Sequence, residues 1–280
     1  MKIFLQVSVS GTKEQQDLLL PSMLELGCRG FEETGTRLVG YFEEPADAGA
    51  AQRLRDALFT VLRKISANAE ISFGELADRN WNEEGERTIR PIEIGERIAI
   101  RPSWRGYSGP AERIVLTIDP KMSFGTGYHE TTRLMLRLVE KYLRPGSVVL
   151  DIGTGTGVLA IAAARLGAAS AVGTDTDGWA VENARENVAL NGVRDRVRIC
   201  HGTLPGGSSF VPSMICANLT LNDHLQLLPR YREILSDGGR LLISGLLASD
   251  EATAGRALSG AGFRTVETLR ENEWLAICAE

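Results

Sequence analysis

The chain has 280 residues, of which 43% are hydrophobic and 24% are charged, and its formal net charge is −5. These proportions are ordinary for a soluble globular protein and allow one large domain or two compact ones. The acidic balance argues against a protein that binds nucleic acid through a general surplus of basic residues. We therefore expect no direct nucleic-acid specificity.

The cysteines and histidines give no sign of a metal site. None of the four cysteines forms a C-x-x-C pair, and the three histidines lack the spacing to carboxylates or thiols that metal ligands show. We expect free thiols and no metal. The N-terminus lacks the order of a secretory signal, and no apolar helical segment approaches the roughly 20 residues that span a membrane. We therefore expect a cytoplasmic protein without a membrane segment.

Residues 1–75 predict a small α+β domain of the ferredoxin-like type. The expected elements are a strand at 2–10, a helix at 13–26, a hairpin around Gly35, a helix at 47–66 and a strand at 69–73. This βαββαβ order is that of the split β-α-β motif. The domain contains no catalytic constellation, so we expect it to recognise a substrate or partner. Residues 76–110, with Trp81 and Trp104, form the expected connector.

Residues 111–280 predict an α/β domain in which strands and helices alternate. Strands are expected at 147–151, 171–175, 196–200, 213–218 and 239–245, with helices at 157–166, 178–190, 222–235 and 249–261. A terminal antiparallel pair turns at Glu271-Asn272. Alternating units indicate a doubly wound parallel sheet. Seven strands with an antiparallel last strand resemble the Rossmann-like fold of class I S-adenosylmethionine (SAM) methyltransferases, whereas a simple NAD-binding domain has six parallel strands.

The glycine-rich loop after the first of these strands can hold either of two cofactors. Residues 155–160 fit the dinucleotide pattern G-x-G-x-x-G/A, and Asp175 lies 20 residues after Gly155, as in NAD-binding domains. However, Asp151 precedes the loop, and its carboxylate would repel a pyrophosphate at the helix N-terminus. SAM has no phosphate and carries a sulfonium and an ammonium, so Asp151 favours SAM. In the alternative interpretation, turn N–H groups simply satisfy the Asp151 carboxylate.

Two further stretches accompany the loop. SFGTGYHETTRLMLRLVEKYL, residues 123–143, combines a glycine-flanked Thr126 with a helix that Thr131 or Thr132 could cap. PSMICANLT ends a strand at Asn218, at the sheet edge where ligands bind in open α/β folds. Each stretch alone is also compatible with an ordinary loop, cap or turn.

Six stretches together resemble, in order and spacing, the PrmA family of bacterial methyltransferases that act on large-subunit ribosomal protein eleven. They are MSFGTGYHETTRLML, VLDIGTGTGVLAIAAARLGA, GTDTD, ENVALNGV, ANLT and SDGGRLLISGLL. The close resemblance covers residues 120–250 or so, and the FGTG-x-H-x-TT element is its most specific part. Gly85 and Gly178 depart from residues that are common in the family. The resemblance implies a SAM-dependent protein lysine N-methyltransferase.

The resemblance also implies where the cofactor binds. SAM contacts would fall on Thr132, Gly153, Asp175 and Asn218, and Phe124, Thr126 and Gly155 would line the same pocket. Asp175 would hold the ribose, and Asn218 would present its side-chain carbonyl to the incoming amine as the catalytic residue. His129 is a candidate general base, although we favour a structural role for it. No acid is needed, since the leaving thioether is neutral.

The expected partner is large-subunit ribosomal protein eleven, free or on the ribosome, and its lysine side chains or N-terminal amine are the expected acceptors. We expect a monomeric enzyme. Three alternatives stay open: an enzyme of the same fold that acts on another protein lysine or a small-molecule amine, an NAD-dependent oxidoreductase, and a SAM-binding or ribosome-interacting protein without catalytic activity.

Overall fold

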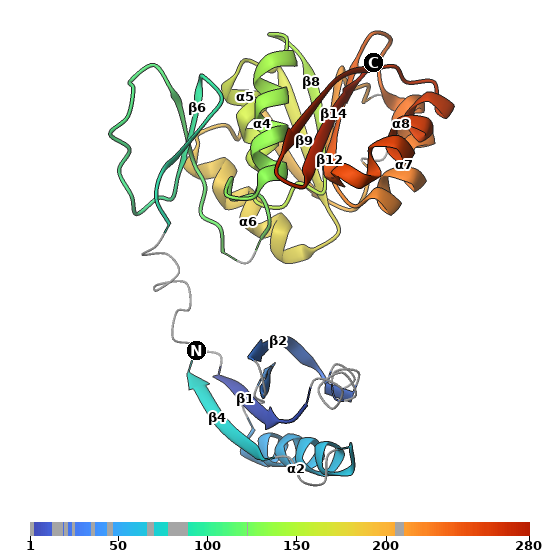
Figure 1. The fold of residues 1–280 in the computed structure, drawn as a ribbon. Coiled ribbons are helices and arrows are strands. Elements are labelled where there is room, and N and C mark those ends of the chain that lie inside the picture. The colour runs from blue at the N-terminus through green and yellow to red at the C-terminus, as the bar shows by residue number, and fades with distance from the viewer. Residues whose placement is uncertain are drawn as a thin grey trace. The chain divides into compact units, whose positions relative to one another are not determined.

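The structure is a computed structural model of residues 1–280. It describes residues 3–12, 19, 22–23, 26–34, 37–43, 47–65, 70–77, 89–121, 123–204 and 210–280. The chain divides into two compact units, Met1–Arg87 and Thr88–Glu280, and Figure 1 shows the elements of each. The predicted connector therefore overlaps both units, and Trp81 and Gly85 lie outside the described residues.

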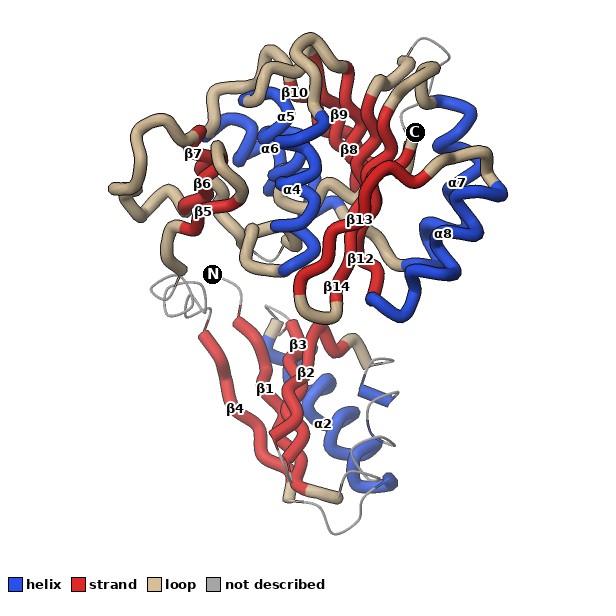
Figure 2. The backbone as a smooth tube through the Cα atoms, turned by 45° about the horizontal axis from the view of Figure 1, so that its top comes forward, coloured by secondary structure: helices blue, strands red, loops and turns tan. Residues whose placement is uncertain are grey.

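The first unit contains a four-stranded antiparallel sheet with α2 packed against it (Figure 2). Its elements are β1 (Ile3–Ser10), β2 (Cys28–Thr34), β3 (Arg37–Glu43), α2 (Ala48–Ile65) and β4 (Ile71–Ala77). Alternate β1 residues such as Leu5 and Val7 meet Leu58 and Leu62 of α2 in one apolar core. The strand order β2-β3-β1-β4 is the one that the predicted ferredoxin-like fold requires. Most of the predicted helix at 13–26 lies outside the described residues.

The second unit begins with a small three-stranded sheet. It consists of β5 (Ile92–Ile94), β6 (Ile98–Arg101) and β7 (Ile114–Thr117), and β6 lies between the other two. These strands pack Ile94, Ile98 and Leu116 into the same core as the large sheet. Residues that the sequence placed in the connector are thus part of the second unit.

A seven-stranded sheet forms the centre of this unit. Its strands are β8 (Val148–Ile152), β9 (Ser170–Asp175), β10 (Val197–His201), β11 (Met214–Asn218), β12 (Arg240–Leu247), β13 (Thr265–Glu271) and β14 (Trp274–Ala279). Their order in the sheet is β10-β9-β8-β11-β12-β14-β13, and β14 enters antiparallel between β12 and β13. The hairpin turns at Asn272, whose φ is 52°. The predicted seven-stranded class I architecture is confirmed.

Helices cover both faces of the large sheet (Figure 1). The helices are α4 (Glu130–Tyr142), α5 (Val158–Arg165), α6 (Gly178–Leu190), α7 (Leu221–Ile234) and α8 (Glu251–Gly260), and a short 3-10 helix (Ala248–Asp250) precedes α8. Alternation along β8 separates two cores: Val149 packs with α4, α5 and α6, whereas Leu150 packs with α7 and α8. Because both faces of the central strands are buried, functional groups are left to the strand ends.

Candidate functional site

The parallel strands bring three predicted site residues to one edge of the sheet. Strand β8 lies between β9 and β11, and Ile152 pairs with Thr174 on one side and with Ala217 on the other. Asp175 and Asn218, the next residues along β9 and β11, therefore flank the loop that follows β8. Asp151 lies one residue before the end of β8. The expected cluster at the carboxyl edge is present in the structure.

The loop after β8 adopts a conformation that favours glycine. Gly153, Gly155 and Gly157 have φ values of 68°, 54° and 83°. A Cβ atom at Gly155 would lie 2.2 Å from the carbonyl oxygen of Phe124, and one at Gly153 would lie 2.6 Å from Cδ2 of Leu219. The loop thus packs directly between the FGTG segment and the residues that follow β11. All three sequence stretches meet here.

Asp175 holds this loop in place from the end of β9. Its Oδ2 atom accepts a hydrogen bond from the backbone N–H of Gly155 at 2.9 Å, and its Oδ1 atom accepts one from Asp177 at 3.0 Å. The side chain is only half-buried. Each carboxylate oxygen can accept more than one hydrogen bond, so Asp175 retains acceptor capacity at the surface of the site.

Asp151 is buried, with 1% of its surface exposed. Its Oδ2 atom accepts hydrogen bonds from the Thr154 hydroxyl at 2.6 Å and from the Ala160 N–H at 3.3 Å, whereas its Oδ1 atom has no partner among the described residues. Burial raises the pKa of this carboxyl to about 7; the two hydrogen bonds lower it, and the Asp175 charge raises it further. The turn therefore satisfies one oxygen only, and a nearby cation would stabilise the carboxylate.

The FGTG segment covers the glycine loop. The Phe124 carbonyl accepts a hydrogen bond from the Thr156 N–H at 2.9 Å, and the Gly125 carbonyl accepts one from the Thr156 hydroxyl at 2.7 Å. The Phe124 side chain remains 53% exposed, and Thr126 is half-buried. An exposed aromatic side chain beside a glycine-rich loop is typical of a ligand-binding surface.

The first turn of α4 follows this segment. His129 is the N-cap, and its Nδ1 atom accepts a hydrogen bond from the Thr131 N–H at 3.3 Å. The imidazole contacts two aromatic rings, with centroid distances of 5.2 Å to Phe124 and 4.8 Å to Trp274. These contacts favour the structural role for His129. Thr132 is 1% exposed, and its hydroxyl has no partner among the described residues.

Asn218 is the half-buried residue that ends β11. Its Nδ2 atom donates a hydrogen bond to the Thr131 hydroxyl at 3.1 Å. The following residue, Leu219, donates its N–H to the Ser244 carbonyl at 3.1 Å, which fixes the turn after the strand. The sequence did not reveal the link from Asn218 to Thr131. The signal that the sequence offered was the presence of two adjacent threonines, Thr131 and Thr132, in the His-x-Thr-Thr element.

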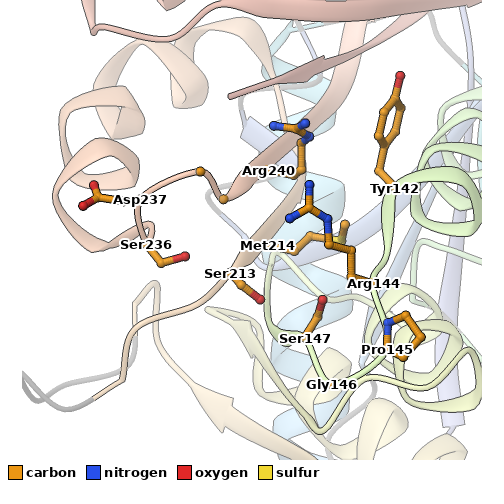
Figure 3. Close-up of a pocket in the computed structure, with 12 residues that line it drawn as sticks. Tyr142, Arg144, Pro145, Gly146, Ser147, Ser213, Met214, Ser236, Asp237 and Arg240 are labelled. Carbon is orange, nitrogen blue, oxygen red and sulfur yellow. The ribbon is translucent and has the colours of Figure 1, made fainter.

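A separate pocket, with a volume of about 250 Å³, lies at the opposite edge of the sheet (Figure 3). It is lined by residues that precede or begin β8, β11 and β12, including Arg144, Ser147, Ser213, Asp237 and Arg240. None of the predicted site residues lines it. The candidate site is therefore the carboxyl edge, not this pocket.

Comparison with known proteins gives one consistent family. The family model described as "Ribosomal protein L11 methyltransferase (PrmA)" matches residues 4–280. A relative from Thermus thermophilus, named ribosomal protein L11 methyltransferase, is 37% identical over 270 residues, which cover 96% of each chain. A relative of the same name from Chlorobaculum parvum is 36% identical over 272 residues, covering 94% of this chain and 92% of its own.

Among solved structures, a ribosomal protein L11 methylase from Lactobacillus delbrueckii is 29% identical, with a TM-score of 0.64. The match covers 68% of this chain and 97% of that structure. In the part of this chain that the structure describes, no helix is long and apolar enough to cross a membrane.

Proposed function

Since the chain belongs to the ribosomal protein L11 methyltransferase (PrmA) family, we propose that it transfers methyl groups from SAM to amines of ribosomal protein L11. The observation that carries this proposal is the meeting of Asp151, Asp175 and Asn218 around one glycine loop. The proposed acceptors are lysine side chains and the N-terminal amine. The ribosomal substrate would place the reaction in the cytoplasm.

The residues at the carboxyl edge fit SAM. Asp175 retains acceptor capacity for the two ribose hydroxyls, and the unpaired oxygen of Asp151 provides negative potential for a cationic ligand. The unpartnered hydroxyl of Thr132 is a second buried polar atom that lacks a partner among the described residues. Gly153 and Gly155 would let the ligand approach the backbone, and Phe124 and Thr126 would cover it. When bound, SAM supplies an electrophilic methyl group on a sulfonium.

The acceptor must reach this methyl group as a neutral amine. A free lysine has a pKa near 10.4, so its deprotonation at pH 7 costs about 4.6 kcal/mol. A desolvated site lowers the pKa of the amine and reduces this cost. Asn218 donates its Nδ2 hydrogen to Thr131, so its Oδ1 atom is available to accept an amine N–H and to align the nitrogen lone pair.

The amine proton would leave to bulk water. His129 is poorly placed to take it through Nδ1, because that atom already accepts the N–H of Thr131 and lies beside its hydroxyl. The N-terminal unit would recognise L11, since it has an apolar core of its own and, among its described residues, no group of His, Cys, Asp and Glu side chains that could hold a metal ion. We propose that the enzyme works as a monomer on L11, free or assembled in the ribosome.

The test is transfer of labelled methyl groups from SAM to purified, unmethylated L11, resolved by mass. We expect label on L11, and a much lower rate of labelling in N218A while SAM still binds. Deletion of residues 1–75 should abolish transfer to L11 without abolishing SAM binding. Label on other proteins only would show that the chemistry is right and the substrate is wrong. Tight binding of NADH, with no affinity for SAM, would refute the proposal.

A further inference from the structure

Asn218 is joined to the N-cap of α4 through a single hydroxyl group. Its Nδ2 atom lies 3.1 Å from Thr131 Oγ1, and this oxygen lies 2.9 Å from Nδ1 of His129. Thr131 is 1% exposed, so water competes little for its hydroxyl. The three side chains therefore form a short, protected line of hydrogen bonds that ends at the proposed catalytic amide.

The helix cap gives this line a direction. In the tautomer in which Nδ1 of His129 accepts the Thr131 N–H, as in this N-cap, Nδ1 carries no hydrogen and shares its single lone pair between that N–H and the Thr131 hydroxyl. The hydroxyl oxygen must then accept its other hydrogen bond, and the Nδ2 group of Asn218 is the donor. A flipped Asn218 would need the same hydroxyl hydrogen that His129 receives. The cap therefore turns Nδ2 inward and leaves Oδ1 for the acceptor.

The histidine at the start of the line is itself held firmly. Its ring contacts Phe124 at an interplanar angle of 59° and Trp274 at 66°. Trp274 belongs to β14, and the adjoining turn is tied to α4 because Asn272 donates to Glu130 at 2.9 Å. The imidazole thus contacts two aromatic rings that oppose its rotation, which keeps Nδ1 pointed at Thr131.

We propose that Thr131 is a positioning residue that fixes the amide of Asn218 with its carbonyl oxygen toward the substrate amine. This inference rests on the proposed function, because it assigns the outward carbonyl to an amine acceptor. It also predicts a chemical selectivity. Primary and secondary amines carry an N–H that Asn218 can accept, whereas a tertiary amine has a lone pair but no N–H. Thr131 therefore assists only the methyl transfers in which the acceptor still has a hydrogen.

The test is a double-mutant cycle with T131V, N218A and the double variant, and with T265V as the matched control on an exposed strand position. T131V should lower kcat about tenfold, as expected for the loss of one hydrogen bond, with the SAM dissociation constant within about twofold of wild type. T131S should restore most of kcat. The double variant should be no slower than N218A, since Thr131 acts through Asn218. The proposal would be overturned if the fold-reductions of kcat in T131V and N218A multiplied in the double variant. It would also be overturned if T131V kept the wild-type kcat.

A second measurement needs no variant. In protein labelled with ¹⁵N-asparagine, one side-chain amide hydrogen of Asn218 should exchange with solvent at least about tenfold more slowly than that of free asparagine, because it is bonded to a buried hydroxyl. Equal exchange rates would contradict the hydrogen bond, even if T131V failed to fold. Absence of methyl transfer to L11 by the wild type would instead refute the proposed function, and the amide exchange would still test the role of Thr131.

Discussion

The two ends of the parallel strands differ in how fully their polar groups are paired. At the amino ends, turns close on themselves: Ser147 donates its N–H to the Arg144 carbonyl at 3.1 Å, and Gly239 donates to Ser236 at 2.9 Å. At the carboxyl ends, Asp151 keeps a buried oxygen without a partner among the described residues. Buried polar groups are normally paired, so the unpaired oxygen of Asp151 supports the proposal that a ligand binds at the carboxyl end.

The largest expected effect is a difference in SAM affinity between variants of two aspartates, one at each end of the strands. Asp175→Ala removes the acceptor of the Gly155 N–H together with the proposed ribose ligand. Hydrogen bonds to charged groups contribute about 1.5–3 kcal/mol each, so SAM should bind at least about 100-fold more weakly. Asp237→Ala, in the pocket of Figure 3, should leave SAM affinity unchanged. Titration calorimetry of both variants checks this, and similar losses would remove the distinction between the ends.

Gly155 and Gly146 are a matched pair of glycines with positive φ, one at each end of the parallel strands. Gly155→Ala places a methyl group 2.2 Å from the Phe124 carbonyl oxygen and also strains a left-handed backbone, so unfolding should become easier by about 2–4 kcal/mol. Gly146, at the amino end, has a φ of 83° but no atom within 4 Å of the added Cβ. Gly146→Ala should therefore cost only the backbone strain, about 1–2 kcal/mol. Denaturant unfolding of both variants separates the clash from the strain.

The pH dependence of stability tests the buried carboxyl. Asp151 has a folded-state pKa of about 7, raised by burial from its ordinary value of 3.8. Its contribution to the stability of the ligand-free protein is therefore full below about pH 4 and is lost as the pH rises through about 7. Wild type should lose about 3 kcal/mol more than D151N between pH 5 and pH 8. Parallel pH profiles for the two proteins in urea unfolding would contradict the burial of this carboxyl.

The smallest changes in stability and activity are expected for a substitution at the amino-end pocket. Arg144 is an exposed residue on its rim, away from the glycine loop. Arg144→Ala should change the free energy of unfolding by no more than about 0.5 kcal/mol and leave methyl transfer at the wild-type rate. Loss of transfer in this variant would give the pocket in Figure 3 a functional role and would weaken the contrast between the two ends.

The sequence predicted those features that depend on neighbouring residues. The alternation of strands and helices and the hairpin at Asn272 have local signatures, and the structure confirms them; the predicted ends of the five parallel strands differ from the observed ends by up to two residues. Asp175 was expected to accept ligand hydroxyls, and the structure adds that it also anchors Gly155. The expected cofactor contacts themselves stay predictions.

Contacts between residues that are far apart in the chain were not predicted from the sequence. The hydrogen bond from Asn218 to Thr131 spans 87 positions, and the ring contact between His129 and Trp274 joins α4 to the last strand. The predicted connector at 76–110 contains β5 and β6, but the sequence did not show that they pair with β7 in one small sheet, because strands of 3–4 residues are too short to show clear alternation. These contacts were missed for one physical reason: packing between elements that are remote in the chain produces no periodic pattern in its sequence.

The most direct test of the account is a crystal structure of the full chain with S-adenosylhomocysteine. The account predicts ribose hydroxyls within hydrogen-bond distance of Asp175, the amino group on the side of Asp151, and the sulfur facing Asn218, whose amide nitrogen still points at Thr131. Binding of the product at the amino-end pocket, or an Asn218 amide turned the other way, would contradict it.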